Sequence, residues 1–137
     1  MKTALLFATM LIVVGCGSKA STTRTLSLNL ARTGVNDGRT FYIIARATDQ
    51  ASFMADSYEK IADLVKGKSS DILGMQLIWP KHNQVLKFKV PKDQAVAVYC
   101  LFTTPNSDWK VLLNPPLKNR YVLNLEGGNV ELQLFKK

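Results

Sequence analysis

The sequence predicts a mainly β protein, an antiparallel two-sheet β-sandwich with one helical insertion. Several short segments alternate apolar and polar residues or are rich in β-branched and aromatic residues. Gly, Pro, Asn and Asp separate these segments at regular spacing. Only one stretch, 49–66, has helical spacing of its apolar residues. A chain of 137 residues with this pattern is typical of one sandwich domain.

Eight segments are predicted to be strands. They are 24–32, 41–48, 74–79, 84–90, 95–104, 109–113, 120–125 and 129–135. Segment 95–104 is apolar on both faces, which predicts a central strand. Segments 120–125 and 129–135 are joined through Gly127 and Gly128, which predicts a tight hairpin. The residues expected to line one face of that hairpin are Tyr121, Leu123, Leu125, Val130, Leu132 and Leu134.

The helix predicted over 49–66 begins at Asp49, which can cap it, and stops at Gly67. Its apolar stripe consists of Phe53, Tyr58, Ile61, Leu64 and Val65. Asp56 and Glu59 fall on the polar side, where we expect solvated carboxylates. A short turn is expected over 69–73.

The N-terminus has the pattern of a bacterial lipoprotein signal. Lys2 precedes an apolar run over 4–14 that is too short to span a bilayer, and Gly15 and Cys16 follow. We therefore expect a signal peptide over 1–15, a lipidated tether over 16–23 and a folded domain over 24–137. A diacylglycerol and an N-acyl chain on Cys16 would hold the protein on the membrane. Since no Asp follows Cys16, the expected location is the periplasmic face of the outer membrane.

Nothing in the sequence points to catalysis or to nucleic-acid binding. The net charge of +8 is dispersed along the chain, as on a solvated surface. The chain lacks phosphate-loop, nucleophile-elbow and Cys-x-x-Cys motifs. The single histidine, His82, lies in a predicted turn without neighbouring ligands, so neither a metal site nor another cofactor is expected. We therefore expect a binding protein and not an enzyme.

Three further residues are assigned structural roles. With Cys16 lipidated, Cys100 has no partner for a disulfide and is expected to be a packed, inert thiol. Trp79 and Trp109 are expected in the core or at the sandwich edge.

The order of several weak motifs resembles the TssJ (VasD/Lip) lipoproteins of type VI secretion. After the lipobox, a first strand and an Asn-Asp-Gly loop, these motifs are Phe53-Met54-Ala55-Asp56-Ser57-Tyr58, Leu73-Gly74, Ile78-Trp79-Pro80, the apolar strand 96–102 and Ser107-Asp108-Trp109-Lys110. Lys81, Thr103 and Lys110 depart from the family pattern, as in a divergent member.

The resemblance implies a transthyretin-like sandwich that anchors a trans-envelope complex at the outer membrane. The implied partner is the periplasmic domain of a TssM-like inner-membrane protein, with a TssL-like protein in the same complex. The partner-binding loop carried over from the family is Gly34, Val35, Asn36, Asp37, Gly38 and Arg39. We expect Val35 and Arg39 to be its exposed contacts. A plain hairpin connection is an equal alternative for this loop.

Other functions remain open from the sequence. A pilotin-type lipoprotein that escorts a secretin would need a groove or an exposed strand edge. A periplasmic inhibitor or glycan-binding lipoprotein is another candidate, although small inhibitors often rely on disulfides. An envelope hydrolase would need carboxylates such as Asp56, Glu59, Asp71 and Asp108.

Overall fold

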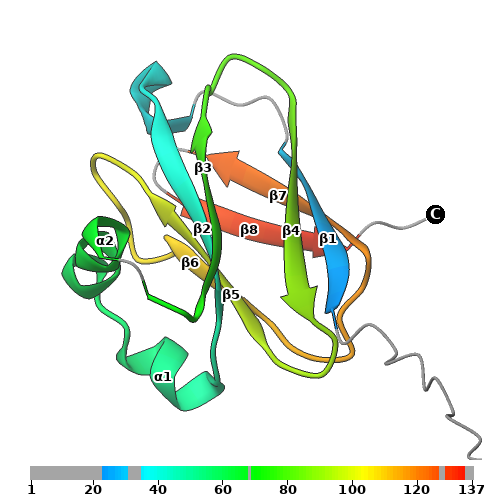
Figure 1. Ribbon diagram of the computed structural model, residues 1–137. Coiled ribbons are helices and arrows are strands. Elements are labelled where there is room, and N and C mark those ends of the chain that lie inside the picture. Colours follow the sequence, from blue (N-terminus) through cyan, green and yellow to red (C-terminus); the bar gives the residue numbers. More distant parts are fainter. Residues whose placement is uncertain (1–22, 31–34, 68, 127–128, 135–137) are drawn as a thin grey trace, which may run out of the picture.

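Two four-stranded β-sheets packed face to face form the protein, and two short helices lie beside one of them (Figure 1). The computed structural model describes residues 23–30, 35–67, 69–126 and 129–134. The elements are β1 Thr23–Leu30, the 3-10 turn η1 Val35–Gly38, β2 Phe41–Ala47, α1 Gln50–Ala55, α2 Tyr58–Lys66, β3 Ile72–Ile78, β4 Gln84–Pro91, β5 Val96–Leu101, β6 Lys110–Leu113, β7 Arg120–Glu126 and β8 Asn129–Leu134. The predicted β-sandwich with a helical insertion is confirmed.

The two sheets have the strand orders β4-β1-β7-β8 and β3-β2-β5-β6. Neighbouring strands are antiparallel except β1 and β7, which run parallel from Ser27 opposite Arg120 to Leu30 opposite Leu123. Because β1 and β2 belong to different sheets, the chain between them crosses from one sheet to the other. The alternative of a plain hairpin at this loop is therefore wrong.

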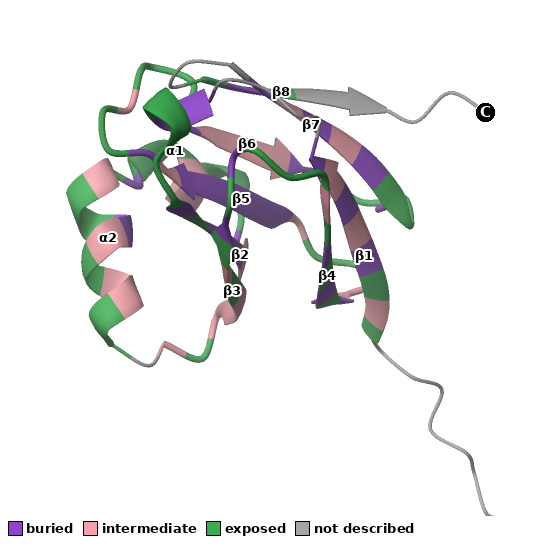
Figure 2. Ribbon diagram, turned by 90° about the horizontal axis from the view of Figure 1, so that it is seen from above, coloured by how far each residue is buried: buried purple, intermediate pink, exposed green. Residues whose placement is uncertain are grey.

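The core lies between the sheets and follows the alternation seen in the sequence. Leu26, Leu28 and Leu30 of β1 are buried, as are Tyr121, Leu123 and Leu125 of β7 together with Val130. Figure 2 shows the same alternation as bands along β1. The side chains of Leu132 and Leu134 lie outside the described residues.

Strand β5 is the central strand that its apolar sequence predicts. It lies between β2 and β6, and five of its six residues are buried. Cys100 is fully buried there, and burial raises the pKa of its thiol, which confirms an inert packed residue.

The helical insertion consists of two helices and not of the one predicted over 49–66. Asp49 caps α1 by accepting a hydrogen bond from the Ser52 N–H at 2.8 Å, as expected. Asp56 and Ser57 have extended backbone angles, and the Ser57 side chain caps α2. The backbone thus leaves the helix at Asp56, and the Ser57 cap starts the second helix.

The end of the insertion also differs slightly from expectation. Helix α2 ends before Gly67, as predicted, but β3 already begins at Ile72, so the turn expected over 69–73 is shorter. Among the described residues, no helix is long and apolar enough to cross a membrane. The expected signal peptide and the expected tether up to residue 22, with Cys16, lie outside them, whereas Thr23, the last residue of the expected tether, already begins β1.

Candidate functional site

The carboxylate of Asp56, at the junction of the two helices, is completely buried. One oxygen accepts hydrogen bonds from Arg46 Nη1 at 2.6 Å and from the Tyr99 hydroxyl at 2.5 Å. The other oxygen accepts from Lys60 Nζ at 2.8 Å. The expectation that Asp56 is solvated is wrong, because the helix breaks at this residue and turns the side chain toward the sheet.

Arg46 of β2 joins this carboxylate to a second one, since its Nε donates to Asp71 Oδ2 at 2.6 Å. Burial by itself raises the pKa of Asp56, but hydrogen bonds from Lys60 and Tyr99 and the charge of Arg46 lower it overall. Burial and the neighbouring Asp56 raise the pKa of Tyr99 above its usual range. Asp56 therefore stays ionised and the Tyr99 phenol stays neutral.

Further contacts from β6 and from residues next to β5 and β6 fix the same helices. Lys110 Nζ donates to the carbonyl oxygens of Phe53 and Asp56 at 2.6 and 2.7 Å and lies 4.7 Å from the Phe53 ring centre. The Tyr58 hydroxyl donates to the Phe102 carbonyl at 2.5 Å. Trp109 is buried and packs edge-on against Tyr58 at 5.2 Å between ring centres. The segment 53–58 thus clamps the helical insertion to the sheet.

The residues carried over as a partner-binding loop divide into a buried and an exposed part. Val35 and Asn36 are buried, so the expectation that Val35 is exposed is wrong. Asp37, Gly38 and Arg39 are exposed, whereas Gly34 lies outside the described residues. We call the three exposed residues the exposed loop.

Asn36 holds this loop in place. Its Oδ1 accepts a hydrogen bond from the Thr103 N–H at 2.8 Å, and its Nδ2 donates to the Arg39 carbonyl at 3.0 Å. Asn36, Asp37 and Gly38 all have φ between 52° and 73°, the left-handed region that Asn, Asp and Gly tolerate best. The loop is therefore rigidly built, with Asp37 and Arg39 presented to solvent.

The turn between β3 and β4 lies beside the exposed loop. Together they enclose a hollow of about 210 Å³ lined by Gly38, Thr40, Trp79, Pro80, Lys81 and His82. His82 is a turn residue, as predicted. Trp79, just beyond the edge strand β3, is 54% exposed. No cluster of three or more His, Cys, Asp or Glu that fits a metal ion occurs in the part of the chain that the structure describes.

The architecture is that of a class of β-sandwich lipoproteins from type VI secretion systems. Lip of Serratia marcescens, a membrane-bound component of such a system, superimposes with a TM-score of 0.62 at 12% identity over 85% of this chain and 99% of Lip. TssJ1, a lipoprotein from Pseudomonas aeruginosa, gives 0.52 at 12% identity over 84% and 98% of the two chains. A chain in a structure of the TssM C-terminal domain from EAEC gives 0.61 at 16% identity over 82% and 98%.

The chain belongs to the IglE N-terminal domain family, whose model matches residues 42–125. The resemblance to TssJ and Lip is confirmed, and at these identities it is a likeness of fold. No curated protein matches the sequence.

Proposed function

We propose that this protein is a lipid-anchored component of a type VI secretion membrane complex. In this proposal it binds the periplasmic domain of a TssM-like inner-membrane protein, with a TssL-like protein in the same complex. The observation that carries the proposal is the match of nearly the whole described fold to Lip, together with membership of the IglE N-terminal domain family.

The exposed loop, Asp37 to Arg39, is the proposed contact surface. Asn36 fixes its backbone before any partner arrives, which lowers the entropy cost of binding. Asp37 and Arg39 offer one charge of each sign, and Arg is enriched in protein interfaces. Asn36 itself is not part of the proposed contact surface, because it is buried and its amide already bonds Thr103 and Arg39 within the protein.

Attachment to the membrane is proposed to occur through lipid on Cys16 after removal of residues 1–15. The tether, which ends before β1 begins at Thr23, would let the domain reach its partner from the periplasmic face of the outer membrane. Cys16→Ser should leave the domain folded and move it from the membrane fraction to the soluble fraction. A variant that still sediments with outer membranes would contradict this anchor.

We further propose that the role is binding and not catalysis. Both oxygens of the buried Asp56 carboxylate are already engaged by Arg46, Tyr99 and Lys60, so this acid works as a clamp for the helices. The same engagement opposes the proton exchange that a general acid or base needs.

The exposed loop is tested by measuring the affinity of the detergent-solubilised full chain for the purified periplasmic domain of the TssM-like protein from the same genome. The double variant Asp37→Ala/Arg39→Ala should bind about tenfold more weakly, the loss expected when a contact residue is truncated. The matched control is Lys92→Ala/Asp93→Ala, which removes the same two kinds of charge from the exposed turn between β4 and β5. Equal affinities of the two double variants would remove the loop from the interface.

A further inference from the structure

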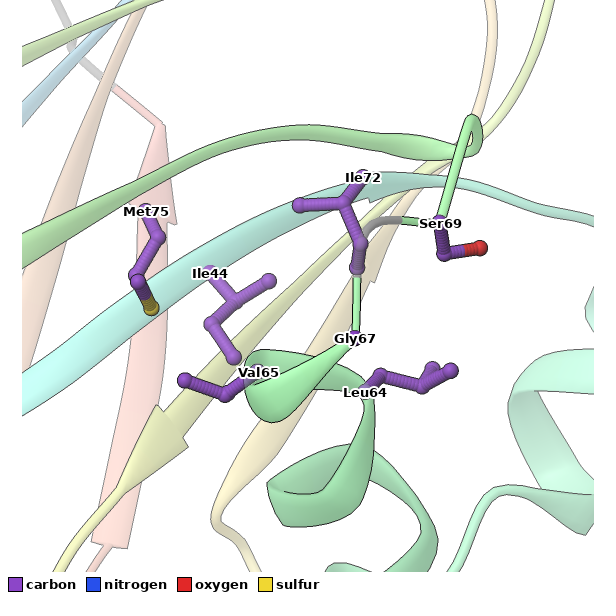
Figure 3. A pocket seen from close by; sticks show the side chains of 7 residues that line it. All are labelled: Ile44, Leu64, Val65, Gly67, Ser69, Ile72 and Met75. Atoms are coloured by element: carbon purple, nitrogen blue, oxygen red, sulfur yellow. The ribbon is translucent and has the colours of Figure 1, made fainter.

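The two outer faces of the sandwich differ in what they expose to solvent. Helix α2 covers part of the β3-β2-β5-β6 sheet, and an apolar pocket of about 280 Å³ lies between this helix and the sheet. Figure 3 shows Ile44 and Met75 of the sheet and Val65 of α2 around this pocket. The outer face of the β4-β1-β7-β8 sheet carries no helix of the described residues (Figure 1). This second face is therefore open to solvent.

Basic side chains lie together on the open face, in the half of the sheet where β1 begins. Ser27 of β1 lies between Lys87 of β4 and Arg120 of β7, and Thr25 of β1 lies opposite Lys89 of β4. The residues that follow them along each strand are buried in the core, so these side chains point out of the sandwich. Lys87, Lys89 and Arg120 are all exposed, and we call these three residues the basic face.

The acidic residues of this sheet lie in its other half. Glu126 ends β7, and Glu131 of β8 is opposite Asn124, which lies beyond the stretch of β7 that pairs with β1. In the turn after β4, Asp93 follows Lys92, so this turn adds no net charge. None of the ion pairs among the described residues involves a lysine of the basic face. The open face is therefore basic where β1 begins and acidic at the opposite end.

The basic face adjoins the point where the proposed membrane tether meets the domain. Strand β1 begins at Thr23, opposite Pro91 at the end of β4. Cys16 lies seven residues before Thr23, and an extended chain of that length spans at most about 25 Å. From the level of Thr23, Lys89 lies about 7 Å and Lys87 about 13 Å along the strands, at about 3.3 Å per residue. A lipid on Cys16 would therefore hold these lysines close to the headgroups of the same membrane.

We propose that the basic face docks on the anionic phospholipid surface of the membrane that holds the tether, and this inference rests on the proposed lipid anchor. Lys and Arg side chains are attracted to anionic headgroups within about 8 Å, the screening length at physiological salt. A lipid chain and a basic surface together bind a membrane more firmly than either alone. A protein partner fits this face less well, because the centre of a protein interface is depleted of charge. The outward residues here include no apolar side chain; they are Thr25, Ser27, Lys87, Lys89 and Arg120.

Docking through the basic face orients the rest of the domain. The acidic half of the same sheet is repelled by anionic headgroups, so the domain tilts away from the membrane at that end. Strand β1 runs from Thr23 to Leu30, and the exposed loop follows its far end in the chain. Figure 1 shows the turn that precedes β2 at the opposite end of the sandwich from the start of β1. The exposed loop thus points away from the membrane, toward a partner that comes from the inner membrane.

The test measures how fast single lysines of the full chain react with a water-soluble amine-reactive ester in the presence of vesicles. Phosphatidylcholine vesicles with and without phosphatidylglycerol are compared, and mass spectrometry quantifies the modification of each lysine. With phosphatidylglycerol, Lys87 and Lys89 should react about fivefold more slowly, and about 0.5 M salt should remove this protection. Lys66 on α2 and Lys81 in the turn between β3 and β4 are exposed away from the basic face, and their rates should change less than about twofold. Unchanged rates at Lys87 and Lys89, or equal slowing at Lys66 and Lys81, would overturn the proposal.

A pair of double variants tests whether the basic face itself causes the protection. The readout is Lys118, which is exposed just before β7 and should also react more slowly with phosphatidylglycerol present. Lys87→Gln/Lys89→Gln should abolish this slowing, whereas Lys66→Gln/Lys81→Gln removes the same charge elsewhere and should retain it. Equal slowing in the two double variants would overturn the proposal. The intact mass reports lipid on Cys16 separately, so a failed anchor and a failed docking face give different results.

Discussion

Replacing Asp56 with Ala removes the carboxylate that holds the two helices against the sheet. The buried Tyr99 hydroxyl loses its acceptor, and Arg46 loses one of its two partners. Breaking a buried ion pair costs about 3–5 kcal/mol, and the low end applies here because Arg46 keeps Asp71 and Lys60 is half exposed. We therefore expect a loss of about 3 kcal/mol in the free energy of unfolding, and a decrease of about 10 °C in Tm.

Urea unfolding followed by circular dichroism measures this loss, and Asp63→Ala is the matched control. Asp63 also pairs with a lysine on α2, Lys66, but both side chains are exposed. Its removal should change the free energy of unfolding by less than about 0.5 kcal/mol. If Asp56→Ala cost no more than Asp63→Ala, the assignment of Asp56 as the clamp of the helical insertion would be refuted.

Three further predictions concern the rest of the fold. Gly74→Ala should cost about 2 kcal/mol of stability in urea unfolding, because its Cβ would lie 2.7 Å from the Phe88 ring, whereas Gly67→Ala meets open space and should cost little. Asn36→Ala and Asn36→Gly should both lower the free energy of unfolding by about 2 kcal/mol, because both remove the hydrogen bonds of the amide. A much smaller loss in Asn36→Gly than in Asn36→Ala would show that the left-handed backbone at this position matters more than the hydrogen bonds. The pKa values of Asp56 and Asp71 are lowered in the folded protein, so the ionised carboxylates stabilise the fold. This contribution to the free energy of unfolding is complete above the ordinary carboxyl range, about pH 4, and is lost as the pH falls through the lowered pKa values. When the free energy of unfolding is measured against pH, Asp56→Ala should therefore lose less stability in acid than wild type.

The strands were predictable from sequence because each buries one face. Alternation in β1, β4 and β7 matches the buried positions, and the uniformly apolar β5 lies inside its sheet. Strand partners were not predictable, because alternation gives the face of a residue and not its neighbour strand. The parallel pairing of β1 with β7 joins segments far apart in the chain, and no local pattern records it.

The site was predicted less well, for a physical reason. Asp56 looks like a solvated helix residue when one continuous helix is assumed. The signal for a break is Ser57, a residue type that favours the N-terminal cap of a new helix. Arg46, Tyr99 and Lys110 come from three different strands, so only the folded structure brings them to the helices. Burial of Val35 and Asn36 likewise depends on the crossing of the chain between sheets, which places Asn36 beside Thr103.

Identification of the partner decides whether this protein binds a TssM-like inner-membrane protein. The full chain, tagged at its C-terminus, is purified from detergent-solubilised envelopes of the native host, and its partners are identified by mass spectrometry. We expect recovery of a TssM-like inner-membrane protein with a periplasmic domain. Its recovery should be reduced in the Asp37→Ala/Arg39→Ala variant and retained in Lys92→Ala/Asp93→Ala. Recovery of an outer-membrane secretin in its place, or of no inner-membrane protein, would contradict it.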